Sequence, residues 1–320
     1  MTLRTCLTFN DVSLVPNYSD LSSRSEVDLS TDCGWRKLQV GIISSPMDTV
    51  TGLDMIRAMR QAGGDGIHHR YCSAMILEDV ARDYPIAVSP SVGLDLIKRI
   101  VGFINPEPVL VIDVAHGDSK PALDYAEGLV KLGATVVSGN IVTWQAAKRY
   151  YDVGVKIMRV GVGCGSSCST RVVAGVGVPQ ITALRDIYGI EEDIKIISDG
   201  GLHSSGDIVK AFVAGADCVM TGRLLAGCAE SLGVSNGDMV SYRGMASGES
   251  LDEAGKERNV EGVAGFVKRN GSVATVMDTL ARGMRAGLAY VGARNIEELR
   301  LKAEFVQVTH NGHIEGMPRI

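Results

Sequence analysis

Eight short runs of β-branched and other apolar residues recur along this chain of 320 residues, and they constrain its fold more than any other feature. The runs span residues 40–44, 65–69, 86–90, 109–113, 135–139, 156–160, 194–199 and 217–222. Amphipathic stretches typical of helices lie between them, at 51–62, 93–103, 119–132, 143–153, 204–214 and 222–230. Buried strands that alternate with helices indicate a parallel sheet covered on both faces, and eight such units match a closed (β/α)8 barrel better than an open sheet.

The number of domains follows from the length and from the internal boundaries. A chain of 320 residues can form one large barrel or two smaller domains. No linker rich in Pro and Ser separates the strand–helix units. We therefore predict one α/β domain, a TIM barrel over residues 1–320.

Composition excludes several classes of function. The net charge of −5 argues against nucleic acid as a partner. Seven cysteines without a CxxC pair form neither a disulfide framework nor a zinc-ligand pattern, which favours a reducing compartment. The N-terminus has no apolar signal segment, and no apolar run is long enough to span a membrane. We expect a cytoplasmic protein that binds neither nucleic acid nor a membrane.

One long loop is predicted at the carboxyl ends of the strands, where barrels of this kind carry their function. The interval from residue 156 to residue 194 is the longest between successive strand starts, and it contains the glycine-rich segment 161–178. A long loop on the functional face of a compact domain usually performs the chemistry. We therefore interpret 161–178 as the catalytic loop.

Cys168 is the candidate nucleophile in this loop. The small residues before it let the backbone fold closely around a ligand, and the nearby Arg171 favours the thiolate that a nucleophile needs. The alternative is a buried structural cysteine, which we retain as the interpretation of Cys164. The position of Cys168 in the long loop favours the nucleophile.

Two glycine turns predict where a nucleotide binds. Asp199 ends one strand and is followed by two glycines, so its carboxylate can accept hydrogen bonds from ribose hydroxyls. Gly222 and Arg223 follow the next strand, and paired glycine turns after strands seven and eight commonly form the phosphate site of this fold. The alternative is that both are only tight turns.

Weaker signals surround these motifs. Ser45 or Asp48 could simply cap a helix, and Asp113 with His116 could contact a cofactor at the end of another strand. The charged, glycine-rich segment 247–275 resembles an active-site flap, with Arg258 and Glu261 as its acid/base candidates. An ordinary solvated loop is the alternative for that segment.

Seven motifs resemble the IMP dehydrogenase/GMP reductase family and occur in the order of that family: LTFNDVSLVP, SSPMDTVT, VAHGDS, SGNIVT, GVGCGSSCSTRVVAGVGVPQ, ISDGGLHSSGDIVKA and YRGMAS. The resemblance implies a homotetramer of barrels that binds a purine mononucleotide and forms a thioimidate between Cys168 and its C2 atom. It also implies a monovalent cation, K+, on the carbonyls of Gly163, Gly165 and Cys168. The residues predicted to contact the nucleotide are Ser45, Met47, Ser166, Asp199, Gly201, Gly222, Arg223, Tyr242, Gly244 and Met245.

The motifs do not all indicate the same branch of the family. The short link from His69 to Ile86 leaves no room for the CBS insertion that dehydrogenases usually carry, and Arg258-Asn259 stands where they have an Arg-Tyr pair. The resemblance places Glu261 and Thr170 on the catalytic glutamate and its threonine partner. The motifs SSPMDT and GHIEGMP are instead similar to dehydrogenases.

The preferred interpretation is an NADPH-dependent GMP reductase. The alternatives are an IMP dehydrogenase that uses NAD, and a nucleotide-binding barrel without catalytic activity. The presence of Cys168 argues against the last of these.

Overall fold

The eight predicted strands are all present in the computed structural model, which describes residues 3–104, 107–191, 193–248, 250 and 260–318. They are β4 (Ile42–Ser44), β5 (Asp65–Gly66), β6 (Ile86–Val88), β7 (Val109–Ile112), β8 (Thr135–Ile141), β9 (Ile157–Val160), β10 (Lys195–Asp199) and β11 (Cys218–Thr221). Their order in the sheet is β5-β4-β11-β10-β9-β8-β7-β6, and the neighbours pair in parallel.

A single bridge closes this sheet into a barrel. The last strands of the order, β5 and β6, are joined where His68 pairs in parallel with Ile86. The N–H of His68 donates to the carbonyl of Pro85 at 3.0 Å, and the N–H of Ala87 donates to His68 at 2.9 Å. Apolar side chains such as Ile43, Val111 and Ile197 fill the interior and are fully buried. The predicted (β/α)8 barrel is confirmed.

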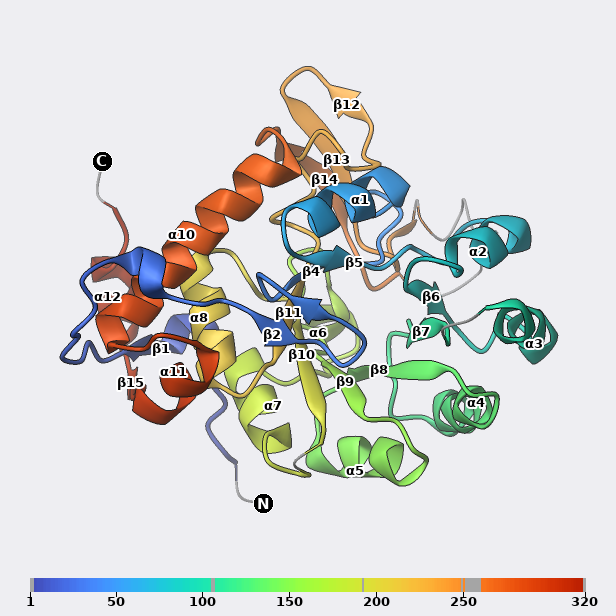
Figure 1. The fold of residues 1–320 in the computed structure, drawn as a ribbon, viewed down its shortest axis with the longest axis horizontal. Helices are drawn as coiled ribbons and strands as arrows, with labels where there is room; N and C mark the ends of the chain where they lie inside the picture. Colours follow the sequence, from blue (N-terminus) through green and yellow to red (C-terminus); the bar gives the residue numbers. More distant parts are fainter. Residues whose placement is uncertain (1–2, 105–106, 192, 249, 251–259, 319–320) are drawn as a thin grey trace.

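Helices cover the outside of the barrel (Figure 1). They are α1 (Leu53–Gln61), α2 (Ala74–Val80), α3 (Leu94–Phe103), α4 (Lys120–Lys131), α5 (Trp144–Asp152), α7 (Gln180–Ile187), α8 (Ser205–Val213) and α10 (Val273–Val291). Their apolar faces pack on the strands, which is why parallel strands can be apolar on both sides. Helix α10 packs against both α1 and α8 and so completes the outer ring.

The prediction of a helix at 222–230 was wrong, because this segment forms a series of turns. The N–H of Leu225 donates to Gly222 at 3.1 Å, and the carbonyls of Leu224 and Gly227 accept hydrogen bonds from Asn270. These carbonyls are therefore not available for a helical ladder. The place of the eighth helix is taken by α10, about fifty residues further along the chain.

The insertion before α10 contains a small antiparallel sheet. Its strands are β12 (Ser235–Asn236), β13 (Met239–Arg243) and β14 (Ala264–Lys268). The predicted flap, 247–275, therefore includes a strand and the first turn of α10, while its residues 251–259 lie outside the described part of the chain. Arg258 falls in that undescribed segment.

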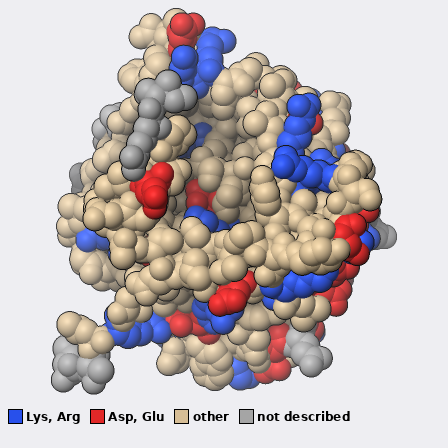
Figure 2. Space-filling model, turned by 90° about the vertical axis from the view of Figure 1, so that its left-hand side faces the viewer, with Lys and Arg blue, Asp and Glu red and all other residues tan. Residues whose placement is uncertain are grey.

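The remaining elements lie at the amino ends of the barrel strands and beside the outer helices. The hairpin of β2 (Thr31–Asp32) and β3 (Lys37–Leu38) lies over the amino ends of the strands, since Gly34 approaches the first residues of β9 and β10. Strand β1 (Val12–Leu14) pairs with β15 (Phe305–Gln307), beside α11 (Ile296–Lys302) and α12 (His310–Glu315). Among the described residues, no helix is both long and apolar enough to cross a membrane. Acidic and basic side chains are interspersed on the face shown in Figure 2.

Candidate active site

A cavity of about 450 Å³ lies at the carboxyl ends of the barrel strands. It is lined by the predicted reactive and cation-site residues, which are Gly163, Gly165, Cys168, Thr170 and Glu261. It is also lined by every residue that was predicted to contact the nucleotide: Ser45, Met47, Ser166, Asp199, Gly201, Gly222, Arg223, Tyr242, Gly244 and Met245. Asp113 lines the cavity as well, whereas His116 is exposed and is not among its lining residues.

The glycine-rich loop can enter the cavity because its backbone passes very close to that of β10. A Cβ atom added to Gly161, which has φ +152°, would lie 2.1 Å from the carbonyl oxygen of Asp199. Only glycine fits this approach. The sequence signal that selected this loop therefore has a direct steric basis.

Backbone hydrogen bonds bring Glu261 to the glycine-rich loop 161–178. Cys168 pairs with Gly262 in an antiparallel bridge, and the N–H of Ser169 donates to the carbonyl of Glu261 at 2.9 Å. The N–H of Glu261 donates in turn to Ala246 at 3.0 Å. Three segments that are distant in sequence are thus held side by side, and Glu261 lies close to Cys168.

The three predicted reactive residues form one chain of hydrogen bonds. The thiol of Cys168 donates to Oγ1 of Thr170 at 3.2 Å, and this hydroxyl donates to Oε2 of Glu261 at 2.8 Å. Cys168 is exposed, so a ligand in the cavity can reach its sulfur. In such an arrangement a carboxylate can accept a thiol proton through a hydroxyl, so the three side chains could act as a proton relay.

Cys164, in the same loop, has a different environment. Its thiol donates to the carbonyl oxygen of Asp199 at 3.1 Å. Burial, together with the nearby charge of Asp199, raises the pKa of the Cys164 thiol far above its ordinary value. A thiol that stays protonated is a poor nucleophile, which favours the interpretation of Cys164 as a structural residue.

A buried arginine links the two carboxylates of the cavity. Nη1 of Arg159 donates to Oδ1 of Asp113 at 2.9 Å, and its Nε donates to Oδ2 of Asp199 at 2.8 Å. Asn140 also donates to Oδ2 of Asp199, at 2.7 Å. Among the described residues, Oδ1 of Asp199 has no hydrogen-bond partner, so it can accept from a ligand. The sequence analysis did not select Arg159, although a charge inside an apolar strand was a usable signal.

A second arginine holds Asp113 from the other side. Nε of Arg70 donates to Oδ2 of Asp113 at 3.0 Å and to its carbonyl oxygen at 3.1 Å. Burial alone would raise the pKa of Asp113, but the charges of Arg70 and Arg159 outweigh it and hold this pKa below its usual range. Asp113 is therefore a buried anion fixed by two guanidinium groups.

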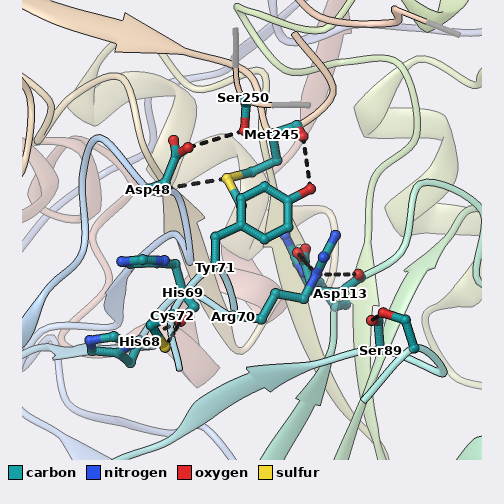
Figure 3. Close-up of polar contacts among 12 residues, drawn as sticks. Asp48, His68, His69, Arg70, Tyr71, Cys72, Ser89, Asp113, Met245 and Ser250 are labelled. Atoms are coloured by element: carbon teal, nitrogen blue, oxygen red, sulfur yellow. Dashed lines mark hydrogen bonds and ion pairs between the residues drawn. The ribbon is translucent and has the colours of Figure 1, made fainter. Parts of the chain in front are cut away.

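The residues after β4 contact the segment after β13. Neither Ser45 nor Asp48 caps α1, because the helix begins at Leu53 with Gly52 as its N-cap. Asp48 instead forms an ion pair with Arg243 at 2.8 Å and accepts from Ser250 at 3.0 Å. Figure 3 shows Asp48 beside Met245, whose carbonyl accepts from Tyr71 at 3.2 Å.

The side chains of Tyr242 and Met47 lie beside Gly222, which is in the turn after β11. The hydroxyl oxygens of Tyr242 and Ser166 are 3.3 Å apart. A Cβ atom added to Gly222 would lie 2.4 Å from the sulfur of Met47 and 3.3 Å from the Tyr242 oxygen. The absence of a side chain at Gly222 thus keeps this end of the cavity open.

Comparison with known proteins decides what this site is related to. The profile of the IMP dehydrogenase / GMP reductase domain matches residues 6–319. The chain belongs to this family. The predicted resemblance is therefore confirmed, as is the prediction of an NAD(P)-dependent oxidoreductase of purine nucleotides at the level of the family.

Three similar curated proteins are named inosine-5'-monophosphate dehydrogenase. The chain is 33% identical to an inosine-5'-monophosphate dehydrogenase of Borreliella burgdorferi, over 98% of this chain and 96% of that protein. It is 33% identical to the enzyme of the same name from Cryptosporidium parvum, over 96% of this chain and 93% of that protein. A third, from Thermoplasma acidophilum, is 44% identical over 65% of this chain but only 46% of its own length.

Proposed function

We propose that this protein is a GMP reductase, which converts GMP to IMP with NADPH. The observation that carries the proposal is the relay of Cys168, Thr170 and Glu261, which is complete without any residue of segment 251–259. The reaction releases ammonia from C2 of the purine and replaces it with hydrogen. The release of ammonia needs a nucleophile and a proton donor at that one atom.

The relay supplies both. Glu261 accepts the thiol proton through Thr170, and the sulfur of Cys168 forms a bond to C2. The same proton returns through Thr170 to the amino group as the C2–N2 bond breaks and ammonia leaves. A bound nicotinamide would supply the hydride for C2; the C2–S bond would then break, releasing IMP and regenerating the thiolate of Cys168.

The rest of the cavity would hold the nucleotide in place. Oδ1 of Asp199 can accept a ribose hydroxyl, since Oδ2 is already bound by Arg159 and Asn140. Gly201, Gly222 and Arg223, which belong to the two glycine turns predicted to bind the phosphate, also line the cavity. A volume of about 450 Å³ is in the ordinary range of ligand pockets.

IMP dehydrogenase is the second candidate, and the names of the relatives favour it. That reaction forms the same bond to Cys168 but ends with the attack of water, which must lose a proton. Glu261 could accept this proton through Thr170. The Arg-Tyr pair expected from the dehydrogenase branch is Arg258-Asn259 in this sequence, and an amide cannot replace a tyrosine as base. We therefore prefer the reductase.

The cation and the oligomer predicted from the resemblance remain part of the proposal. The carbonyls of Gly163, Gly165 and Cys168 would coordinate K+, although that of Gly165 also accepts the N–H of Cys168 at 3.0 Å. Carbonyl oxygens are suitable ligands for such an ion, and a carbonyl can accept twice. The homotetramer follows from the same resemblance.

The test is the nicotinamide absorbance band in two parallel assays. One contains GMP with NADPH, and the other contains IMP with NAD+. The proposal predicts faster consumption of NADPH in the first assay than production of NADH in the second. Faster XMP formation from IMP would select the dehydrogenase instead.

A further inference from the structure

The short helical turn α6 (Thr170–Val173) carries the relay hydroxyl of Thr170, and no buried side chain anchors it. Its N-cap, Ser169, makes no side-chain capping hydrogen bond. Val172 is 89% exposed and Val173 is 54% exposed, so neither packs into the core. A helix in a protein is normally stabilised by the packing of an apolar face. Other contacts therefore hold this turn in place.

The side chain of Arg171, the second residue of α6, makes the packing contacts that the valines do not make. A Cβ atom added to Gly163 would lie 2.4 Å from Cγ of Arg171, and one added to Gly177 would lie 2.6 Å from the same atom. Cδ of Arg171 would be 2.9 Å and 3.1 Å from these two positions. The aliphatic stem of Arg171 is therefore packed against glycines from both ends of the loop.

The two ends of the loop also lie close to each other at these glycines. A Cβ atom added to Gly163 would be 3.3 Å from the carbonyl oxygen of Val176, and one added to Gly177 would be 2.9 Å from that of Val162. Both glycines have positive φ, +77° and +153°, which side chains rarely allow. The stem of Arg171 thus covers the place where the two ends of the loop meet.

The guanidinium of Arg171 differs from its stem. The residue is exposed, and among the described residues no hydrogen bond or ion pair holds its charge. Arg171 is also not among the described residues that line the cavity of the candidate active site. Long charged side chains often stabilise a structure through their methylenes while the charge stays in water. The sequence analysis considered only the charge of Arg171, as an aid to the thiolate of Cys168.

We propose that Arg171 is a positioning residue, whose aliphatic stem holds α6 on the loop so that Thr170 reaches both Cys168 and Glu261. The relay depends on two single hydrogen bonds of 3.2 Å and 2.8 Å. A displacement of α6 by about 1 Å would break either of them. This inference rests on the proposed function only in taking Cys168 and its relay to be reactive, which applies equally to a GMP reductase and to an IMP dehydrogenase.

The experiment compares Arg171→Ala, Arg171→Met and Arg171→Lys with the wild type, in whichever of the two nicotinamide assays shows turnover. Lys keeps the stem and the charge, Met keeps only the stem, and Ala removes both. We expect Arg171→Ala to lower kcat about tenfold or more and to change the KM for the nucleotide less than about twofold, because a displaced relay slows proton transfer but not binding.

The other two variants separate the stem from the charge. Arg171→Met and Arg171→Lys should both keep kcat within about twofold of the wild type, because both keep the packing on the glycines. Val172→Ala is the matched control in the same turn and should behave as the wild type, since its side chain is exposed.

A second readout needs no turnover. The rate at which iodoacetamide alkylates Cys168, followed over a range of pH by the mass of its peptide, reports how readily the thiol loses its proton. We expect the pH profile of Arg171→Ala to become that of Thr170→Val, which lacks the relay hydroxyl, and that of Arg171→Met to stay as in the wild type. If no nucleotide is turned over, the proposed function fails while alkylation still decides the role of Arg171.

Two results would overturn the inference. If Arg171→Met loses as much as Arg171→Ala while Arg171→Lys does not, the charge acts and the stem does not. If Arg171→Ala keeps the wild-type kcat and alkylation profile, the stem does not position the relay, even where the free energy of unfolding, measured with denaturant, decreases.

Discussion

Two groups of charged and polar residues share the cavity, and they are built in opposite ways. Cys168, Thr170 and Glu261 form an open chain with one hydrogen bond at each link, and the cysteine is exposed. The second group, Arg70, Asp113, Arg159 and Asn140 with Asp199, is buried and multiply bonded. Arg159 has a side chain only 8% exposed and bridges two carboxylates.

The difference matches the two tasks of an active site. A reacting sulfur must be accessible and its proton must move, so strong fixed bonds would hinder it. Groups that orient two ligands gain from low mobility, because small displacements are costly in rate. We therefore expect changes in the open chain to alter turnover, and changes in the buried network to alter binding and stability.

The largest effect is expected at Cys168. Cys168→Ala removes the only atom that can bond to C2, so turnover should fall below about a hundredth of the wild-type rate while GMP still binds. Steady-state rates and calorimetry on the same preparation measure both quantities. Cys164→Ala is the matched control in the same loop and should remain active. A Cys168→Ala protein with substantial turnover would rule out covalent catalysis by this residue.

Glu261→Gln should lower GMP turnover by about 100-fold, because it keeps the size of the side chain but cannot accept the thiol proton. The KM for GMP should change little. Thr170→Val interrupts the same relay one residue earlier and should give a similar loss. If Glu261→Gln instead raised KM and left kcat unchanged, Glu261 would belong to the binding group and the comparison would fail.

Asp199→Ala should weaken nucleotide binding by about 2 kcal/mol, which is about 30-fold in Kd. The change removes the free oxygen Oδ1 and also one of the two carboxylates that hold Arg159. Asp199→Asn retains the shape and should lose less. The 2'-deoxynucleotide, titrated into wild type, shows whether the 2'-hydroxyl takes part. Unchanged affinity in Asp199→Ala would remove this residue from the site.

The smallest effect concerns pH and the edge of the buried network. Burial lowers the pKa of His69 to about 4, from an ordinary value near 6.5. The unfolded chain then binds a proton that the folded chain does not, so stability is complete above pH 6.5 and falls as the pH drops toward 4. Between pH 7 and 5 this loss amounts to about 1–2 kcal/mol.

His69→Phe should flatten that pH dependence of the free energy of unfolding, measured with denaturant at pH 7 and pH 5. Glu261→Gln is the control from the open chain and should leave the pH profile as in wild type. Parallel profiles for wild type and His69→Phe would contradict the assignment.

Sequence patterns predicted the barrel because its strands are short, apolar and evenly spaced, and each appears in the structure near its expected place. We predicted a helix at 222–230 because this stretch, which includes Leu224 and Leu225, is amphipathic. The turns are instead stabilised by Asn270, which lies in a segment distant in sequence and donates hydrogen bonds to them. No local pattern contains that information.

The site shows the same limit. The glycine-rich loop was selected from its length and its motif, and Glu261 from the charged flap and the family resemblance. Arg159 and Arg70 were missed because their role depends on neighbours that the fold supplies, such as Asp113 on another strand. Ion pairs between strands are a property of barrel closure, so they follow only once the strand order is known.

The most direct test of the central claim is a mass measurement on protein quenched with acid during turnover of GMP and NADPH. If the open chain performs the chemistry, the peptide containing Cys168 carries a purine nucleotide bound through sulfur, and Cys168→Ala yields no such adduct. A nucleotide on Cys164, or full turnover without any adduct at Cys168, would contradict the account.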